Sequence, residues 1–124
     1  TDVTIVSFGK IIKEADKAAL ELEKEGISCE IIDLRTVKPL DYDAIVASVK
    51  KTNRLVILEE AWPFGNVSTE ITYHVQSHAF DYLDAPIERI NTADTPAPYS
   101  PVLLAEWLPN YEDVVNAVKK VLYK

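Results

Sequence analysis

The chain has 124 residues, of which 48% are hydrophobic, and its 13 basic and 20 acidic side chains give a formal net charge of −7 at pH 7. Residues 1–124 therefore suit a single domain, and the acidic balance argues against nucleic acid, whose phosphates need clustered Lys and Arg, but suits a basic protein partner. Because no apolar run approaches about 18 residues and the start lacks a secretory-signal pattern, we expect a cytoplasmic protein that neither spans nor binds a membrane.

Strands and helices are predicted to alternate along the whole chain. Short, β-branched apolar segments indicate strands, and apolar residues spaced three or four apart indicate helices. The predicted strands cover residues 3–8, 28–33, 54–60 and 87–91. The predicted helices cover residues 10–25 and 67–79, and two more begin near residues 41 and 110. This alternation is typical of an α/β fold in which helices cover both faces of a parallel sheet.

The chain contains only three glycines, Gly9, Gly26 and Gly65. Neither a dinucleotide-binding fingerprint nor a P-loop can be written with them, because both need several glycines within a few residues. Such glycines allow the main chain to approach a diphosphate closely. We therefore expect this chain to bind no diphosphate-containing cofactor.

Two carboxylates end the predicted third strand, where open parallel sheets place their ligands. Glu59 and Glu60 are the last residues of that strand, and Gly9 and Lys10 follow the first. Together with Lys10, the two carboxylates suggest one hypothesis: an independent acid–base site in the crevice at the carboxyl ends of these strands. A second hypothesis is a small-ligand regulatory module, which requires a closed apolar pocket there. We favour an interface or loop-anchoring role for the two glutamates, because no histidine or cysteine accompanies them.

Glu70, His74 and His78 are spaced four residues apart in a predicted helix. This spacing aligns them on one face, as a zinc site requires. A fourth ligand and supporting hydrogen-bond partners are not evident in the sequence. We therefore favour a polar flank beside the apolar stripe of that helix and predict no metal site.

Four aromatic residues, Trp62, Phe64, Tyr99 and Trp107, lie in proline-bearing segments outside the periodic core positions. A single loop aromatic is commonly a small extension of the core. Four of them together indicate a protein contact surface, because Trp and Tyr are enriched at interfaces.

Five sequence blocks closely resemble the beta subunits of the pyruvate dehydrogenase family. They occur in the family's order and spacing over nearly the whole chain. The blocks are IDLRTVKPLD at 32–41, KTNRLV at 51–56, EEAWP at 59–63, AFDYLDAP at 79–86 and ADTPAPY at 93–99. The matched region is the C-terminal, transketolase-like domain. The resemblance implies a three-layer α/β/α fold with a mainly parallel four-stranded sheet in the order second, first, third, fourth.

For function, the resemblance implies a parent enzyme that decarboxylates pyruvate and acetylates the lipoyl group of dihydrolipoyl acetyltransferase. In this family thiamine diphosphate and magnesium are bound by the alpha subunit and by the N-terminal domain of the beta subunit. The resemblance therefore implies that the matched domain holds neither cofactor. It also implies that this domain contacts another beta subunit and the alpha subunit and docks the acetyltransferase.

The resemblance also assigns docking residues. Asp84 matches an acidic position that binds the basic subunit-binding domain of the acetyltransferase, and Asp81 is expected to assist it. The terminal carboxylate on Lys124 matches a second acidic position, although a lysine side chain there would repel a basic partner. The alternative is the same domain of a branched-chain 2-oxo acid dehydrogenase, but Trp62-Pro63 and Pro98-Tyr99 favour the pyruvate enzyme.

Overall fold

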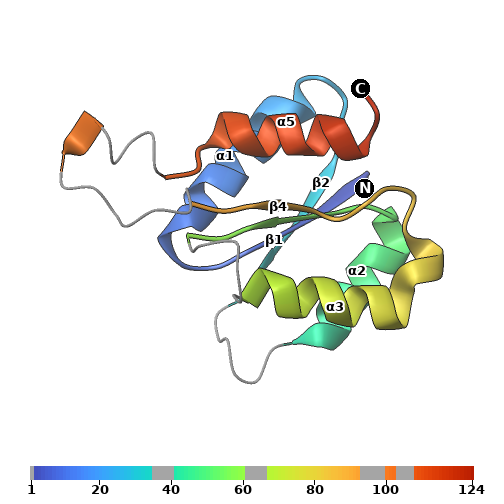
Figure 1. Ribbon diagram of the computed structural model, residues 1–124. Helices are drawn as coiled ribbons and strands as arrows, with labels where there is room; N and C mark the ends of the chain where they lie inside the picture. The colour runs from blue at the N-terminus through green and yellow to red at the C-terminus, as the bar shows by residue number, and fades with distance from the viewer. Residues whose placement is uncertain (1, 35–40, 61–66, 93–99, 103–107) are drawn as a thin grey trace.

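The computed structural model describes residues 2–34, 41–60, 67–92, 100–102 and 108–124. In these ranges a sheet lies between two layers of helices (Figure 1). The strands are β1 (Val3–Ser7), β2 (Cys29–Asp33), β3 (Leu55–Leu58) and β4 (Glu88–Ile90). The helices are η1 (Gly9–Ile11), α1 (Ile12–Glu23), α2 (Tyr42–Thr52), α3 (Val67–Ala79), η2 (Phe80–Tyr82) and α5 (Tyr111–Val121).

The sheet has the order β2-β1-β3-β4, and all its neighbouring strands are parallel. Val6 of β1 lies opposite Ile32 of β2 on one side and opposite Ile57 of β3 on the other. The predicted three-layer fold and strand order are thus confirmed. Because β1 and β3 lie at the centre, every residue in them is buried, whereas β2 at the edge is only partly buried.

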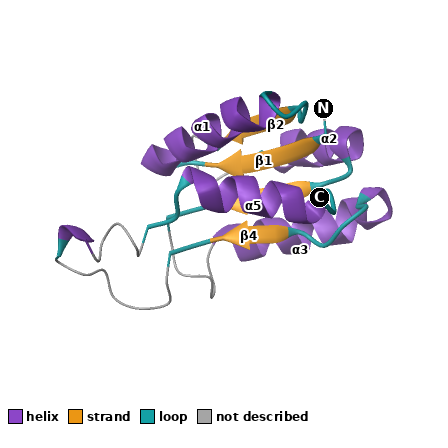
Figure 2. Ribbon diagram, turned by 90° about the horizontal axis from the view of Figure 1, so that it is seen from above, coloured by secondary structure: helices purple, strands orange, loops and turns teal. Residues whose placement is uncertain are grey.

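Each face of the sheet has its own hydrophobic cluster. The first cluster lies under α1 and α5, and the second lies under α2 and α3 (Figure 2). Successive strand residues point to opposite faces, so Ile5 enters the first cluster and Val6 the second. No helix within the described ranges is both long and apolar enough to cross a membrane.

Polar side chains define where two of the helices begin. Asp41 precedes α2, and its carboxylate accepts a hydrogen bond from the Ala44 amide at 3.1 Å. Asn110 precedes α5 and forms a reciprocal capping box with Asp113. Such caps pair amide groups that the first helical turn leaves without partners. The predicted helix starts near residues 41 and 110 are confirmed.

Candidate functional site

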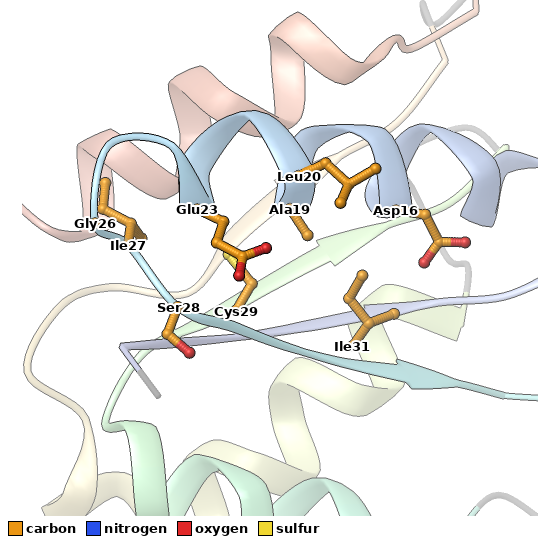
Figure 3. A pocket seen from close by; sticks show the side chains of 9 residues that line it. All are labelled: Asp16, Ala19, Leu20, Glu23, Gly26, Ile27, Ser28, Cys29 and Ile31. Carbon is orange, nitrogen blue, oxygen red and sulfur yellow. The ribbon is translucent and has the colours of Figure 1, made fainter.

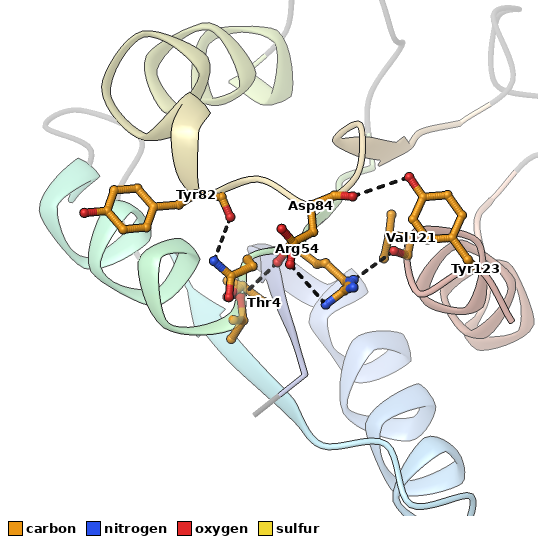
Figure 4. Close-up of polar contacts among 8 residues, drawn as sticks. Thr4, Arg54, Tyr82, Asp84, Val121 and Tyr123 are labelled. Atoms are coloured by element: carbon orange, nitrogen blue, oxygen red, sulfur yellow. Dashed lines mark hydrogen bonds and ion pairs between the residues drawn. The ribbon is translucent and has the colours of Figure 1, made fainter.

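Asp84 lies between η2 and β4, at the edge of the sheet where the strands begin. Its carboxylate is 56% exposed and lies 3.8 Å from the Arg54 guanidinium, which comes from the residue before β3. Figure 4 shows that the end of α5 approaches the same place. The Tyr123 hydroxyl donates a hydrogen bond of 3.4 Å to the Asp84 carbonyl. The structure therefore brings Asp84 next to Tyr123. Lys124 follows Tyr123, and its amide donates to the Lys119 carbonyl at 2.8 Å.

A groove of about 520 Å³ opens beside Asp84. Two aromatic side chains that line it are largely exposed, Phe80 by 62% and Tyr123 by 71%. The other lining residues are Thr72, Gln76, Leu83, Asp84, Ala85, Pro86 and Ile87. Because Asp84 is the predicted docking residue, we call this groove with its Asp84 carboxylate the docking surface. Asp81 lies on η2 and lines a different hollow, so it is not part of this surface.

Asn53 fixes the main chain of the docking surface. Its backbone is left-handed, with φ of 65°, at the end of α2. Its side-chain amide donates to the Tyr82 carbonyl at 2.7 Å, and its own carbonyl accepts from the Asp84 amide at 2.8 Å. Asn53 therefore holds the segment that carries Asp84 against the end of α2.

Asn53→Ala is expected to lower the free energy of unfolding by about 1–2 kcal/mol, because it loses the bond to Tyr82 and strains a left-handed residue. Asn53→Gly loses the same bond but tolerates the positive φ, so it should be less destabilising. Urea denaturation of the two variants separates the contribution of the lost hydrogen bond from that of the strained left-handed backbone. Equal stability of Asn53→Ala and the parent would contradict this role.

Glu59 lies on the opposite side of the sheet from Asp84, where the strands end. It directly follows β3 and is fully buried. Its carboxylate accepts hydrogen bonds from the Asn91 amide at 2.6 Å, the Ser68 hydroxyl at 2.5 Å and the Ser68 backbone amide at 3.2 Å. Ser68 is in the first turn of α3, where backbone amides favour a negative charge. Glu59 thus joins the start of α3 to the end of β4. Both carboxylate oxygens already accept from donors of this chain, which suits a structural anchor better than a general base.

The other predicted crevice residues lie near Glu59. Ser7 and Leu58 are paired across β1 and β3, so Gly9 and Glu59 follow neighbouring strand ends. Gly9 has a φ of +74°, a conformation that glycine adopts readily, and it leads into η1. Lys10 and Glu60 are exposed. Among the described residues no ion pair joins Lys10 to Glu59 or Glu60, which gives no support to the hypothesis of an acid–base site there.

Comparison with known proteins identifies the family. Residues 1–114 match the family model described as transketolase, C-terminal domain. The chain belongs to this family. A solved structure entitled "Split gene transketolase, inactive beta4 tetramer" superposes with a TM-score of 0.84 at 30% identity, over 98% of this chain and 38% of that one.

This transketolase C-terminal domain is also similar to pyruvate dehydrogenase E1 component beta subunits. It is 53% identical to the protein of Rickettsia felis over 99% of this chain, and 54% identical to that of Rhizobium meliloti over the same share. It spans 38% and 27% of the length of these relatives. The predicted resemblance is confirmed.

The histidines of the transketolase C-terminal domain form a ring stack. The ring centroids of Tyr42 and His74 are 3.9 Å apart, and those of His74 and His78 are 4.1 Å apart. The pKa of His74 is lowered, first by desolvation against its neighbours and then by His78, while Asp43 opposes the shift. Glu70 is exposed on the same helix. Within the described part of the chain, no three His, Cys, Asp or Glu side chains are grouped to hold a metal ion.

A second groove, of about 590 Å³, lies between α1 and the edge strand β2 (Figure 3). Leu20 and Ile31 supply apolar walls, and Asp16 and Glu23 supply carboxylates. Burial raises the pKa of the Cys29 thiol in this groove to about 11, with Asp2 adding to the shift. The thiol therefore remains protonated near neutral pH and is a poor nucleophile.

Sequence reasoning did not identify Asn53, Arg54 or Tyr123 as site residues. The only signal near Tyr123 was the docking role that the resemblance assigned to the next residue, Lys124. Trp62, Phe64, Tyr99 and Trp107 lie outside the described residues. Their role in a protein contact surface stays a prediction.

Proposed function

We propose that this chain is the C-terminal domain, residues 1–124, of a longer pyruvate dehydrogenase beta subunit and that it serves assembly and docking. Its partners are a second beta subunit, the alpha subunit and the subunit-binding domain of dihydrolipoyl acetyltransferase. The complete enzyme decarboxylates pyruvate and transfers the acetyl group to a lipoyl group. The two bacterial relatives, both named as pyruvate dehydrogenase beta subunits, support pyruvate over branched-chain substrates.

The observation that carries the docking proposal is the exposed carboxylate of Asp84 beside an apolar groove. A basic side chain of the partner can form a charge-assisted hydrogen bond with this carboxylate. Phe80 and Tyr123 offer apolar area next to it, as the centres of protein interfaces commonly do. The net charge of −7 adds long-range attraction for a basic partner.

Thiamine diphosphate and magnesium belong to other parts of the complete enzyme in this proposal. The edge of the sheet where a parallel α/β domain binds a ligand carries Glu59 and Glu60, whose carboxylates oppose a diphosphate. These residues do not fit the cofactor.

The docking proposal is tested by titrating the chain with the purified subunit-binding domain of the acetyltransferase at low salt. Asp84→Lys is expected to weaken binding at least about tenfold, because it replaces an attractive charge pair by a repulsive one. Glu112→Lys makes the same change in net charge at the other end of α5 and should stay within about twofold of the parent. Undiminished binding by Asp84→Lys would refute the assigned role of Asp84.

A further inference from the structure

The backbone of Arg54 is anchored in the interior of the domain. Its carbonyl accepts hydrogen bonds from the Thr4 amide at 2.9 Å and from the Thr52 hydroxyl at 3.0 Å. The Thr4 hydroxyl lies 2.7 Å from those of both Thr52 and Ser48, and all three side chains are buried. Each hydroxyl has one proton to donate. Because Thr52 donates its proton to the Arg54 carbonyl, it accepts from Thr4, and Thr4 in turn accepts from Ser48. A directed chain of hydroxyls thus ends on Arg54.

The side chain of Arg54 extends from this anchor to the docking surface (Figure 4). Its Nε atom donates to the carbonyl of Val121, the last residue of α5, at 3.0 Å. Its Nη1 atom lies 3.8 Å from the Asp84 carboxylate. The side chain is only 24% exposed, so it is held in place between the two groups that it contacts. One guanidinium therefore joins the end of α5 to Asp84.

The two halves of the docking surface come from distant parts of the chain. Asp84 is carried by the segment before β4, whereas Tyr123 follows α5. The hydrogen bond between the Tyr123 hydroxyl and the Asp84 carbonyl is long, at 3.4 Å, and exposed, so it contributes little by itself. A second link between the halves runs through Arg54, which contacts both of them.

We propose that Arg54 is the positioning residue of the docking surface: it holds the end of α5 against the Asp84 segment and so keeps Asp84 and Tyr123 in the arrangement that a basic partner binds. The proposal rests on the docking function proposed above. Arg54 is not expected to contact the partner itself. It acts through the Val121 carbonyl and the Asp84 carboxylate.

Electrostatics alone predicts the opposite effect of removing Arg54. The positive charge of Arg54 beside Asp84 weakens the attraction of a basic partner, so a variant with a neutral residue at position 54 should bind that partner more tightly. If Arg54 positions the surface, the same variant should bind the partner less tightly, because ordering the loosened segment opposes binding. The sign of the change therefore distinguishes the two roles.

The test compares Arg54→Gln with Lys120→Gln. Lys120 is also near the end of α5 and forms an ion pair of 2.8 Å with Glu88, and it is 71% exposed. Both variants lose one positive charge, but only Arg54→Gln loses contacts with Val121 and Asp84. Arg54→Gln should weaken binding of the subunit-binding domain about fivefold, and Lys120→Gln should leave it unchanged or slightly tighter. Binding of Arg54→Gln as tight as the parent's would overturn the proposal.

Arg54→Lys provides a second variant without a change in charge. A single ammonium cannot reproduce the fork that reaches both Val121 and Asp84, so binding should weaken about threefold. Electrostatics alone predicts no change for this variant. Parent-like affinity for Arg54→Lys together with tighter binding by Arg54→Gln would assign Arg54 a purely electrostatic role.

Amide hydrogen exchange gives a readout that needs no partner. In Arg54→Gln the amides of Tyr123 and Lys124 should exchange about tenfold faster than in the parent, while the Val56 amide in β3 stays protected, showing that the fold is intact. Unchanged exchange at Tyr123 and Lys124 would contradict positioning. If the parent chain fails to bind the subunit-binding domain, the docking function is wrong, but the exchange data still decide whether Arg54 orders the end of α5.

Discussion

Glu59→Ala should lower the free energy of unfolding by about 3–5 kcal/mol. Glu59 is fully buried, and its carboxylate accepts from the Asn91 amide and from both the hydroxyl and the backbone amide of Ser68. The substitution leaves these donors without an acceptor and opens a cavity at the end of β3. Equilibrium urea denaturation, followed by far-ultraviolet circular dichroism, measures the loss.

Glu59→Gln is the matched control for this carboxylate. It keeps the volume of the side chain, but its amide group must face one of the donors that Glu59 now satisfies. A loss of about 1–2 kcal/mol is expected, well below that of the alanine variant. If Glu59→Ala is as stable as the parent, Glu59 does not anchor α3 to β4.

Ile57→Ala should destabilise the domain by about 3–4 kcal/mol, far more than Ile31→Ala, for which about 1 kcal/mol is expected. Ile57 is fully buried in the second cluster beneath α2 and α3. Ile31 lies on the edge strand β2, is only partly buried and lines the open groove beside α1. The same change of side chain therefore leaves a closed cavity at one position and enlarges an existing groove at the other.

Thermal unfolding of the two isoleucine variants checks this difference. Both residues lie in parallel strands and lose the same atoms, so each is the control for the other. Equal destabilisation would mean that the groove beside β2 is closed and that Ile31 is packed as tightly as Ile57. The strand order predicts the larger loss at β3, because only the central strands are covered on both sides.

The local sequence was sufficient to predict most of the helices and strands. The run from Leu55 to Leu58 is continuously apolar, and the run from Val3 to Phe8 is apolar except for Thr4 and Ser7, because β1 and β3 are buried on both faces. Their predicted ends extend past the structure by one or two residues, since Phe8 and Glu59 remain partly or fully buried after the strands end. Burial alone therefore does not mark the last strand residue.

The order of the strands could not be read from their side chains. Ile31 and Ile57 are indistinguishable in the sequence, yet one lies at an edge and the other at the centre. The predicted order came from the family resemblance, and so did the choice of Asp84. Hydrophobic periodicity carries no information on which strand pairs with which.

The contacts around Asp84 were also beyond sequence reasoning. Arg54, Asp84 and Tyr123 are separated by 30 residues or more along the chain, and only the folded sheet brings them together. No rule of residue spacing predicts that an arginine before an apolar strand contacts the end of a helix far away in the sequence. Asp84 and Asp81 line two different grooves, both of which Phe80 also lines, and the expected assistance of Asp81 in docking stays a prediction.

The position of α5 has a consequence for folding during synthesis. Val114, Val118 and Val121 of α5 complete the first cluster, but α5 follows all four strands in the chain. The earlier helix α1 already contributes Ala15, Ala18 and Leu22 to this cluster, but a ribosome must release nearly every described residue before α5 can complete it. Until then the part of the sheet beneath α5, which includes Val56, presents an apolar surface to chaperones and to other nascent chains.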